Sequence, residues 1–303
     1  MSEKVHYLLH GVQDRYSALY QDNIAEFGDQ DIAIASIGGS GQSLLGNILL
    51  ELGLNYADPY IDSLSADGTS APVPAYADYR SRLSATDRTG RDEKATDKPR
   101  WPRFVKTHLT PDFLAHRPLL GAWILTRDPR DSLYSWHKFR TNFAKDPLDL
   151  RAPTFEAWLE QPGPTGVSRL EDWASFYEAW DKARSTFRRT TVTTFEDLKN
   201  DPVPALRKSL GDLGIDVEGA DLARAVERSS FENMRAHEEK HPDNKDRDPM
   251  TRTRIMRSGT PNEWQGWMTP GLHGKFSTGR IADVADRFGY RTAEPCASPE
   301  AAG

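Results

Sequence analysis

The chain has 303 residues and a formal net charge of -6, with 39 Lys and Arg residues against 45 Asp and Glu residues. This acidic balance argues against a general nucleic-acid-binding protein, which needs positive charge to neutralise phosphates. No apolar run reaches the length of a membrane span, and the N-terminus lacks the basic and apolar regions of a secretion signal. The single cysteine, Cys296, excludes an internal disulfide and a cysteine-based metal cluster, so we expect a cytoplasmic enzyme without a membrane span.

The N-terminal third contains a strand, a glycine loop and a helix in succession. Residues 31–36 form a short apolar run that predicts a buried strand, and 37–43 are rich in glycine and serine. Leucines and isoleucines over 44–52 recur on one helical face, and Gly53 is a suitable helix C-cap. Residues 55–100 are polar and too long for an ordinary connection, which predicts a substrate-covering insertion or a partly disordered segment.

Strands and helices alternate in the rest of the chain. Residues 103–107, 121–126 and 190–195 read as strands, and Asp128 followed by Pro129 predicts a helix start. Helices are predicted near 170–187, 202–213 and 221–228. The pattern predicts an α/β fold with a mostly parallel central sheet flanked by helices. We expect a single domain over 1–303, with its core at about 31–288 and a flexible tail at 290–303.

The glycine loop is placed to bind an anion. A loop between a strand and a helix N-terminus presents backbone N–H groups and the positive end of the helix dipole. Compared with the nucleotide-hydrolase motif G-x-x-x-x-G-K-[ST], residues 36–43 retain Gly41 and Ser43 but have Ser36 in place of the first glycine and Gln42 in place of the lysine. A working kinase or ATPase is therefore disfavoured, and a plain tight turn stays an alternative.

With these motifs in view, the chain resembles the cytosolic-type sulfotransferases, whose fold is similar to that of P-loop NTPases. These enzymes move a sulfuryl group from 3′-phosphoadenosine-5′-phosphosulfate (PAPS) to a hydroxyl or amine and release adenosine 3′,5′-bisphosphate (PAP). The resemblance covers about residues 31–288 and rests on blocks in family order. These blocks are Gly38–Ser43, Val105–Leu109, Thr126–Ser135, Phe195–Leu198 with Asp201–Pro202 and Ser230–Met234, and Met256–Thr260 with Trp264.

The resemblance implies His108 as the general base, and a histidine pKa near ~6.5 suits proton abstraction at neutral pH. Lys106 would contact the transferring sulfonate, where negative charge develops. Structural or surface roles for these two residues are the alternatives. The reaction is expected to be in line and metal-free, because no metal-ligand spacing is convincing.

The resemblance also implies the residues that bind the donor nucleotide. Arg127 and Ser135 would bind the 3′-phosphate together with Arg257, although Arg127 pairing only with Asp131 is an alternative. Phe231 would stack on the adenine, or serve as a core residue. The full expected set is Gly38, Gly39, Ser40, Gly41, Gln42, Ser43, Arg127, Ser135, Phe195, Phe231, Arg257, Ser258 and Gly259.

Three residues depart from the family pattern. The loop lysine is replaced by Gly39 and the adenine-stacking tryptophan by Leu44. The family's frequent tyrosine before Glu-Asp is Phe195. Losing one transition-state cation costs about 10²–10³ in rate elsewhere. We expect Lys106 or another cation to compensate, while a slow enzyme or a non-catalytic nucleotide-binding module are alternatives, as is a P-loop kinase.

The expected partner is a small-molecule acceptor. The segments 55–100 and 141–169 are expected to shape its pocket, with a small-molecule tailoring role as the working interpretation and a carbohydrate or lipid acceptor as the alternative. Residues 240–257 carry six basic and three acidic side chains, which fits a loop that orders over the nucleotide. The family's dimer motif is not visible, so the oligomeric state is left open.

Overall fold

A computed structural model describes residues 14–74, 102–114, 117–143, 149–163, 166–240 and 254–293. Its centre is a five-stranded sheet in the order β2-β5-β1-β6-β7, with every neighbouring pair parallel. The strands are β1 (Asp31–Ala35), β2 (Asn55–Ala57), β5 (Arg103–Thr107), β6 (Gly121–Thr126) and β7 (Arg189–Thr194). The predicted mostly parallel sheet is confirmed.

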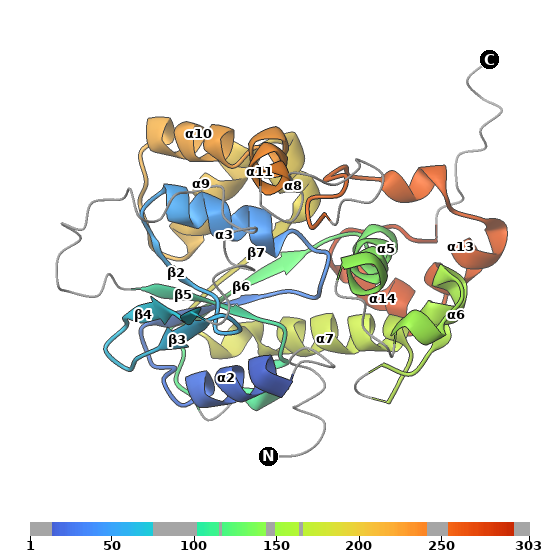
Figure 1. Cartoon of the computed structure of the whole chain (residues 1–303), viewed down its shortest axis with the longest axis horizontal. Helices are drawn as coiled ribbons and strands as arrows, with labels where there is room; N and C mark the ends of the chain where they lie inside the picture. Colours follow the sequence, from blue (N-terminus) through green and yellow to red (C-terminus); the bar gives the residue numbers. More distant parts are fainter. Residues whose placement is uncertain are drawn as a thin grey trace.

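Helices cover both faces of this sheet, as Figure 1 shows. One face packs on α3 (Gln42–Glu51), α9 (Pro202–Asp212) and α10 (Gly219–Arg228), through residues such as Ile34, Trp123 and Leu206. The opposite face packs on α2 (Asp14–Ile24), α7 (Arg169–Ala183) and α14 (Gly279–Arg287), through residues such as Ile124 and Trp173. Burial on both faces explains why the central strands are apolar throughout.

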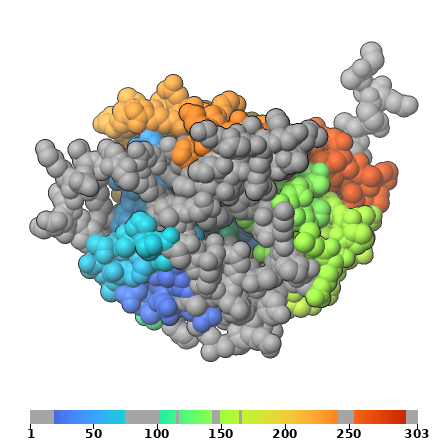
Figure 2. Space-filling model, viewed as in Figure 1, coloured from blue at the N-terminus to red at the C-terminus, as the bar shows by residue number. Residues whose placement is uncertain are grey.

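The remaining elements surround this layered core. The helices are α5 (Pro129–Lys138), α6 (Phe155–Glu160), α8 (Phe195–Asn200), α11 (Phe231–Glu239) and α13 (Pro270–Phe276). Short helical turns are η2 (Pro111–Phe113), η3 (Phe139–Phe143), η4 (Asp149–Arg151), η5 (Arg184–Thr186) and η6 (Glu263–Gly266). In the space-filling view, α10 and α11 form the upper edge, and the segments around α6 (green) and α13 (red) form the right-hand edge (Figure 2). No helix within the described ranges is both long and apolar enough to cross a membrane.

The helix caps follow the sequence signals. Gly53, with φ 72°, lies directly after α3, and its N–H donates to the carbonyl of Leu50 at 2.9 Å. The Asp128 side chain accepts the N–H of Arg130 at 2.9 Å and Pro129 is the first residue of α5. The predicted Asp128 cap is confirmed, whereas the C-cap of α3 is Leu52 and the predicted Gly53 lies one residue beyond it.

Residues 55–74, the described part of the predicted insertion 55–100, contain regular strands. The segment begins with β2, which pairs with β5 at the edge of the main sheet, and continues into an antiparallel pair, β3 (Asp62–Leu64) and β4 (Ser70–Pro72). Three-residue strands are too short to show a hydrophobic period, so the sequence pattern missed them. Residues 75–101 lie outside the described residues.

The core extends beyond both of its predicted ends. Tyr20 and Phe27, which precede residue 31, are 0% and 4% exposed. Tyr290, which follows residue 288, is also buried. Its hydroxyl lies 3.0 Å from the Thr126 hydroxyl and donates to Glu196 at 3.0 Å. The described chain is therefore packed to about residue 292, beyond the expected start of a flexible tail; residues 294–303 lie outside the described residues.

Strand β1 is the switch point of the sheet. The next strands in the sheet lie on opposite sides of it, β5 on one side and β6 on the other. Open parallel sheets bind ligands at the carboxyl ends of strands at such a point. The glycine loop follows β1 directly and is therefore where the topology predicts a site.

Candidate functional site

The glycine loop is packed so closely that its glycines cannot be replaced without displacement. Gly39 and Gly41 have φ 82° and 95°, a region that favours glycine. A Cβ atom on Gly38 would lie 2.6 Å from the Trp136 ring, and one on Gly41 would lie 2.6 Å from Phe195. A Cβ on Gly39 would clash with the carbonyl oxygen of Ser132. A lysine at Gly39, where related loops carry one, is therefore not accommodated by this loop.

The side chain of Gln42 is occupied inside the fold. Its Nε2 donates to the carbonyl oxygens of Ile34 at 2.8 Å and Thr107 at 3.3 Å, and the residue is 8% exposed. Gln42 thus joins the ends of β1 and β5 at the position where nucleotide hydrolases have a phosphate-binding lysine. If Gln42 contacts a nucleotide as predicted, its backbone N–H is the group that can do so, because its side-chain Nε2 is already bonded.

His108 lies at the carboxyl end of β5, beside the loop. Its Nδ1 is 2.6 Å from the carbonyl oxygen of Ser36. Because a carbonyl only accepts, Nδ1 carries the proton, and the neutral ring therefore has its basic lone pair on Nε2. Burial, and then the positive charge of Lys106, lower the pKa of His108 to about 4. The imidazole is therefore neutral at pH 7, the form that a general base requires.

Lys106 and His108 lie together, as the strand alternation predicts. The Lys106 ammonium is 5.3 Å from the centre of the Tyr60 ring, and the His108 ring is 5.3 Å from the same centre. Lys106 is buried and forms an ion pair of 2.9 Å with Asp58. Asp58 was not predicted, because it directly follows the missed strand β2.

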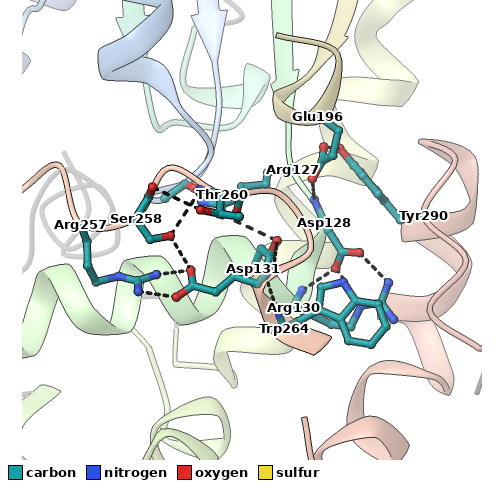
Figure 3. A network of polar contacts seen from close by, with 12 residues as sticks. Arg127, Asp128, Arg130, Asp131, Glu196, Arg257, Ser258, Thr260, Trp264 and Tyr290 are labelled. Atoms are coloured by element: carbon teal, nitrogen blue, oxygen red, sulfur yellow. Dashed lines mark hydrogen bonds and ion pairs between the residues drawn. The ribbon is translucent and has the colours of Figure 1, made fainter. Parts of the chain in front are cut away.

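Arg127 connects the glycine loop to the C-terminal segment (Figure 3). Its guanidinium donates to the carbonyl oxygens of Gly39 and Thr260, both at 3.0 Å. It also lies 3.7 Å from Asp131 and 4.3 Å from the centre of the Phe195 ring. Arg127 thus pairs with Asp131, as the alternative expected, and also contacts the glycine loop and the C-terminal segment of the predicted site.

Arg257 and Ser258 both bind Glu263 in the same network (Figure 3). Arg257 forms two hydrogen bonds of 2.5 Å to the Glu263 carboxylate, and the Ser258 hydroxyl donates to it at 3.0 Å. Asp131 accepts the backbone N–H of Trp264 at 2.7 Å, which holds this segment on α5. Burial raises the pKa of Asp131 to about 6.

Arg130 adds a second buried guanidinium beside that of Arg127, and the sequence did not single it out. It donates to Asp128 at 2.9 Å and 2.6 Å and lies 3.6 Å from the centre of the Trp264 ring. Glu196 accepts the Asp128 N–H at 3.3 Å and the Tyr290 hydroxyl at 3.0 Å. The glutamate lies within the recognised Phe195–Leu198 block, which was the available signal for it.

This network retains N–H donors that could hold an anion. Of the network's own residues, these buried N–H donors have no hydrogen-bond partner in the described part of the chain: Arg127 Nε, Arg130 Nη1, Arg257 Nε and Trp264 Nε1. Unsatisfied buried donors are uncommon, and several around one arginine network fit a polyanionic ligand such as a nucleotide phosphate.

The other predicted nucleotide-binding residues lie around the same loop. Ser135 is on α5 and lies against the loop, since a Cβ atom added to Gly39 would be 3.1 Å from the Cβ of Ser135. Phe231 is the first residue of α11 and is half-buried, which argues against a purely core role. Gly259 has φ 63° and faces this ring, since a Cβ on it would lie 2.5 Å from the ring edge. Residues 241–253 of the predicted basic loop lie outside the described residues.

Comparison with known proteins identifies the family. The family model described as a sulfotransferase domain matches residues 29–279. The chain therefore belongs to the sulfotransferase domain family.

Curated relatives are about a quarter identical to it over the aligned residues. Rat sulfotransferase 2A6 is 26% identical over 179 residues, which are 57% of this chain and 60% of the relative. Human sulfotransferase 1C2 is 24% identical over 198 residues, 61% of this chain and 62% of the relative. The matched region thus spans about 60% of the curated relatives.

Solved structures share the fold over most of the chain. Mouse sulfotransferase SULT7A1 complexed with PAP has a TM-score of 0.57 at 18% identity, covering 90% of each chain. Retinol dehydratase in complex with androsterone and PAP has a TM-score of 0.56 at 17% identity, covering 88% of this chain and 85% of that one. These likenesses confirm the predicted α/β architecture.

Proposed function

We propose that this protein transfers the sulfuryl group of PAPS to a hydroxyl of a small-molecule acceptor, with His108 as general base. The observation that carries the proposal is the Nδ1 contact of His108 with the Ser36 carbonyl, 2.6 Å long, directly beside the glycine loop. This contact leaves Nε2 as the basic atom next to the segment expected to hold the donor's phosphosulfate.

The chemistry requires one proton transfer and one displacement. The acceptor oxygen attacks sulfur while its proton moves to His108 Nε2. The bond between sulfur and the bridging phosphate oxygen breaks, and PAP leaves with the electron pair. The neutral imidazole takes this proton without first losing one of its own. The negative charge of the bound donor raises the low pKa of His108 toward the operating pH, where a general base works best.

The donor's phosphates are assigned to two parts of the site. The 5′-phosphate lies on the backbone N–H groups of residues 38–43, at the N-terminus of α3, where the helix dipole favours an anion. The 3′-phosphate is assigned to Arg127, Ser135 and Arg257, together with Ser258 and the backbone at Gly259. The unpartnered donors of Arg127 and Arg257 support this assignment.

Lys106 supplies the cation that the loop lacks. It is buried next to His108, so its ammonium can approach the charge that develops on the bridging oxygen. In the free protein Asp58 pairs with it, and the transferring group would share the ammonium with this carboxylate. Lys106 thus compensates for Gly39.

The acceptor is proposed to be a small hydroxyl compound with an apolar part. The buried Tyr60 ring packs against His108 at 5.3 Å between ring centres, and the buried Tyr20 packs behind it at 4.5 Å, so the base has an aromatic neighbour on one side. Retinol dehydratase, which shares the fold, is described in complex with androsterone and in complex with retinol. Alcohols of this apolar kind are the first acceptors to screen.

Donor binding and turnover test the proposal separately. Calorimetric titration is expected to show tight binding of PAP and negligible binding of ATP with magnesium. His108→Ala is expected to abolish transfer from PAPS while leaving the PAP dissociation constant within about twofold, because the histidine acts on the acceptor proton. Preferred ATP binding would favour a kinase. PAP binding with no transfer to any acceptor would favour a binding module.

A further inference from the structure

Tyr177 occupies a position at the glycine loop that the reaction as described does not use. It is on α7, is 0% exposed, and lies under the loop with its hydroxyl among three polar groups. Those groups are the carbonyl of Leu125 at 3.0 Å, the N–H of Ile37 at 3.3 Å and the hydroxyl of Ser40 at 3.1 Å. One side chain thus joins α7, β6 and the first half of the loop, from Ile37 to Ser40.

Counting protons fixes the direction of each bond. The Leu125 carbonyl can only accept, so the single Tyr177 proton goes to it. The Ile37 N–H can only donate, so it uses one lone pair of the phenol oxygen. The remaining lone pair can bond Ser40 only if Ser40 donates its proton, because two oxygens without a proton between them repel.

We propose that Tyr177 is a positioning residue for the donor site: its hydroxyl oxygen accepts a hydrogen bond from the Ser40 hydroxyl and holds the loop so that backbone N–H groups alone bind the 5′-phosphate. This inference rests on the proposed function. A phosphate oxygen at neutral pH accepts hydrogen bonds, so a serine whose proton is committed elsewhere has nothing to donate to it. Ser40 is 1% exposed, which agrees with an inward-facing hydroxyl.

Two further observations support this role. Burial raises the pKa of Tyr177, so its hydroxyl keeps the proton on which this arrangement depends. The loop also lacks the lysine that would attract a phosphate by charge, so binding there depends on the geometry of its N–H groups. The hydrogen bonds of Ile37 and Ser40 to the Tyr177 hydroxyl fix that geometry.

A double-mutant cycle with Tyr177→Phe and Ser40→Ala tests the inference, with the PAP dissociation constant as the readout. Each single variant is expected to weaken PAP binding about three- to tenfold, and the double variant no more than Tyr177→Phe alone, because both remove one shared bond. Ser209→Ala is the matched control, since this buried serine bonds the Thr193 hydroxyl at 2.6 Å elsewhere in the fold. It should leave the PAP dissociation constant unchanged.

Independent effects would overturn the inference. If Ser40→Ala weakens PAP binding as strongly in the Tyr177→Phe background as in the wild type, Ser40 contacts the phosphate directly. Amide hydrogen exchange of Ile37 gives a readout without any nucleotide. Exchange is expected to be faster in Tyr177→Phe than in the wild type. Unchanged exchange would show that Tyr177 does not hold the loop at Ile37. If the wild-type protein fails to bind PAP while Ile37 still exchanges faster in Tyr177→Phe than in the wild type, the proposed function is refuted and the role of Tyr177 in holding the loop is not.

Discussion

At the scale of single residues, the environment of His108 decides whether it can act as a base. Its Nδ1–H is held by the Ser36 carbonyl at 2.6 Å, and the nearby Lys106 ammonium opposes a second positive charge. Asp58 acts in the opposite direction on its pKa, but more weakly than burial. The result is a histidine that stays neutral well below pH 7.

Proton NMR of the ligand-free protein can test this titration. One histidine ring resonance, absent from the His108→Gln variant, is expected to titrate near pH 4 rather than near ~6.5. The unfolded chain binds this proton as pH falls through ~6.5, whereas the folded chain binds it only near 4. The free energy of unfolding should therefore decrease between these values. An ordinary pKa for this resonance would contradict the burial argument.

At the scale of elements, the C-terminal segment carries its own counter-charge. Glu263, in η6, binds both Arg257 and Ser258, which are assigned to the 3′-phosphate. A carboxylate and a phosphate compete for the same guanidinium because both accept two parallel N–H bonds. Binding of the donor should therefore require Glu263 to share or release Arg257.

Glu263→Gln tests this competition. Removing the charge is expected to strengthen PAP binding about three- to tenfold, measured by calorimetry at constant salt. Glu171→Gln, which alters an exposed glutamate bonded to Arg280, is the control and should have no effect. Weaker PAP binding in Glu263→Gln would instead indicate that Glu263 holds Arg257 in its binding position.

At the scale of the whole molecule, Arg103 joins the sheet to the segments around it. It is 0% exposed and donates to the Asp31 carboxylate at 2.8 Å and 2.9 Å. It also donates to the carbonyl oxygens of Glu26, Ser65 and Thr69 at 2.8 to 3.1 Å. This arginine therefore connects the approach to β1, the sheet and the β3–β4 hairpin.

Arg103→Met should destabilise the fold by about 3–5 kcal/mol, because it leaves the buried Asp31 charge without its partner. Urea denaturation followed by circular dichroism measures the change. Arg184→Met, which removes a surface pair with Asp181, should cost less than about 1 kcal/mol. Similar losses for the two variants would show that the Arg103 contacts add little.

Local patterns in the sequence were sufficient for much of the fold. The apolar runs of β1, β5 and β6, the helix spacing of α3 and the Asp128–Pro129 cap are signals between near neighbours, and the structure confirms them. The motif blocks also directed attention to His108, Lys106 and Arg127, which the structure brings to one edge of the sheet. What these residues bind stays a prediction.

Only the tertiary structure revealed the partners of those residues. Tyr177 meets Ser40 from 137 residues away, and Lys106 meets Asp58 from 48 residues away. Such pairs depend on how helices and strands pack, and no local period or spacing encodes them. Composition and local pattern thus predicted a parallel α/β protein with a loop placed to bind an anion, whereas packing decided the tautomer of His108, the counter-ions of the cations and the contacts of Tyr177 with the loop.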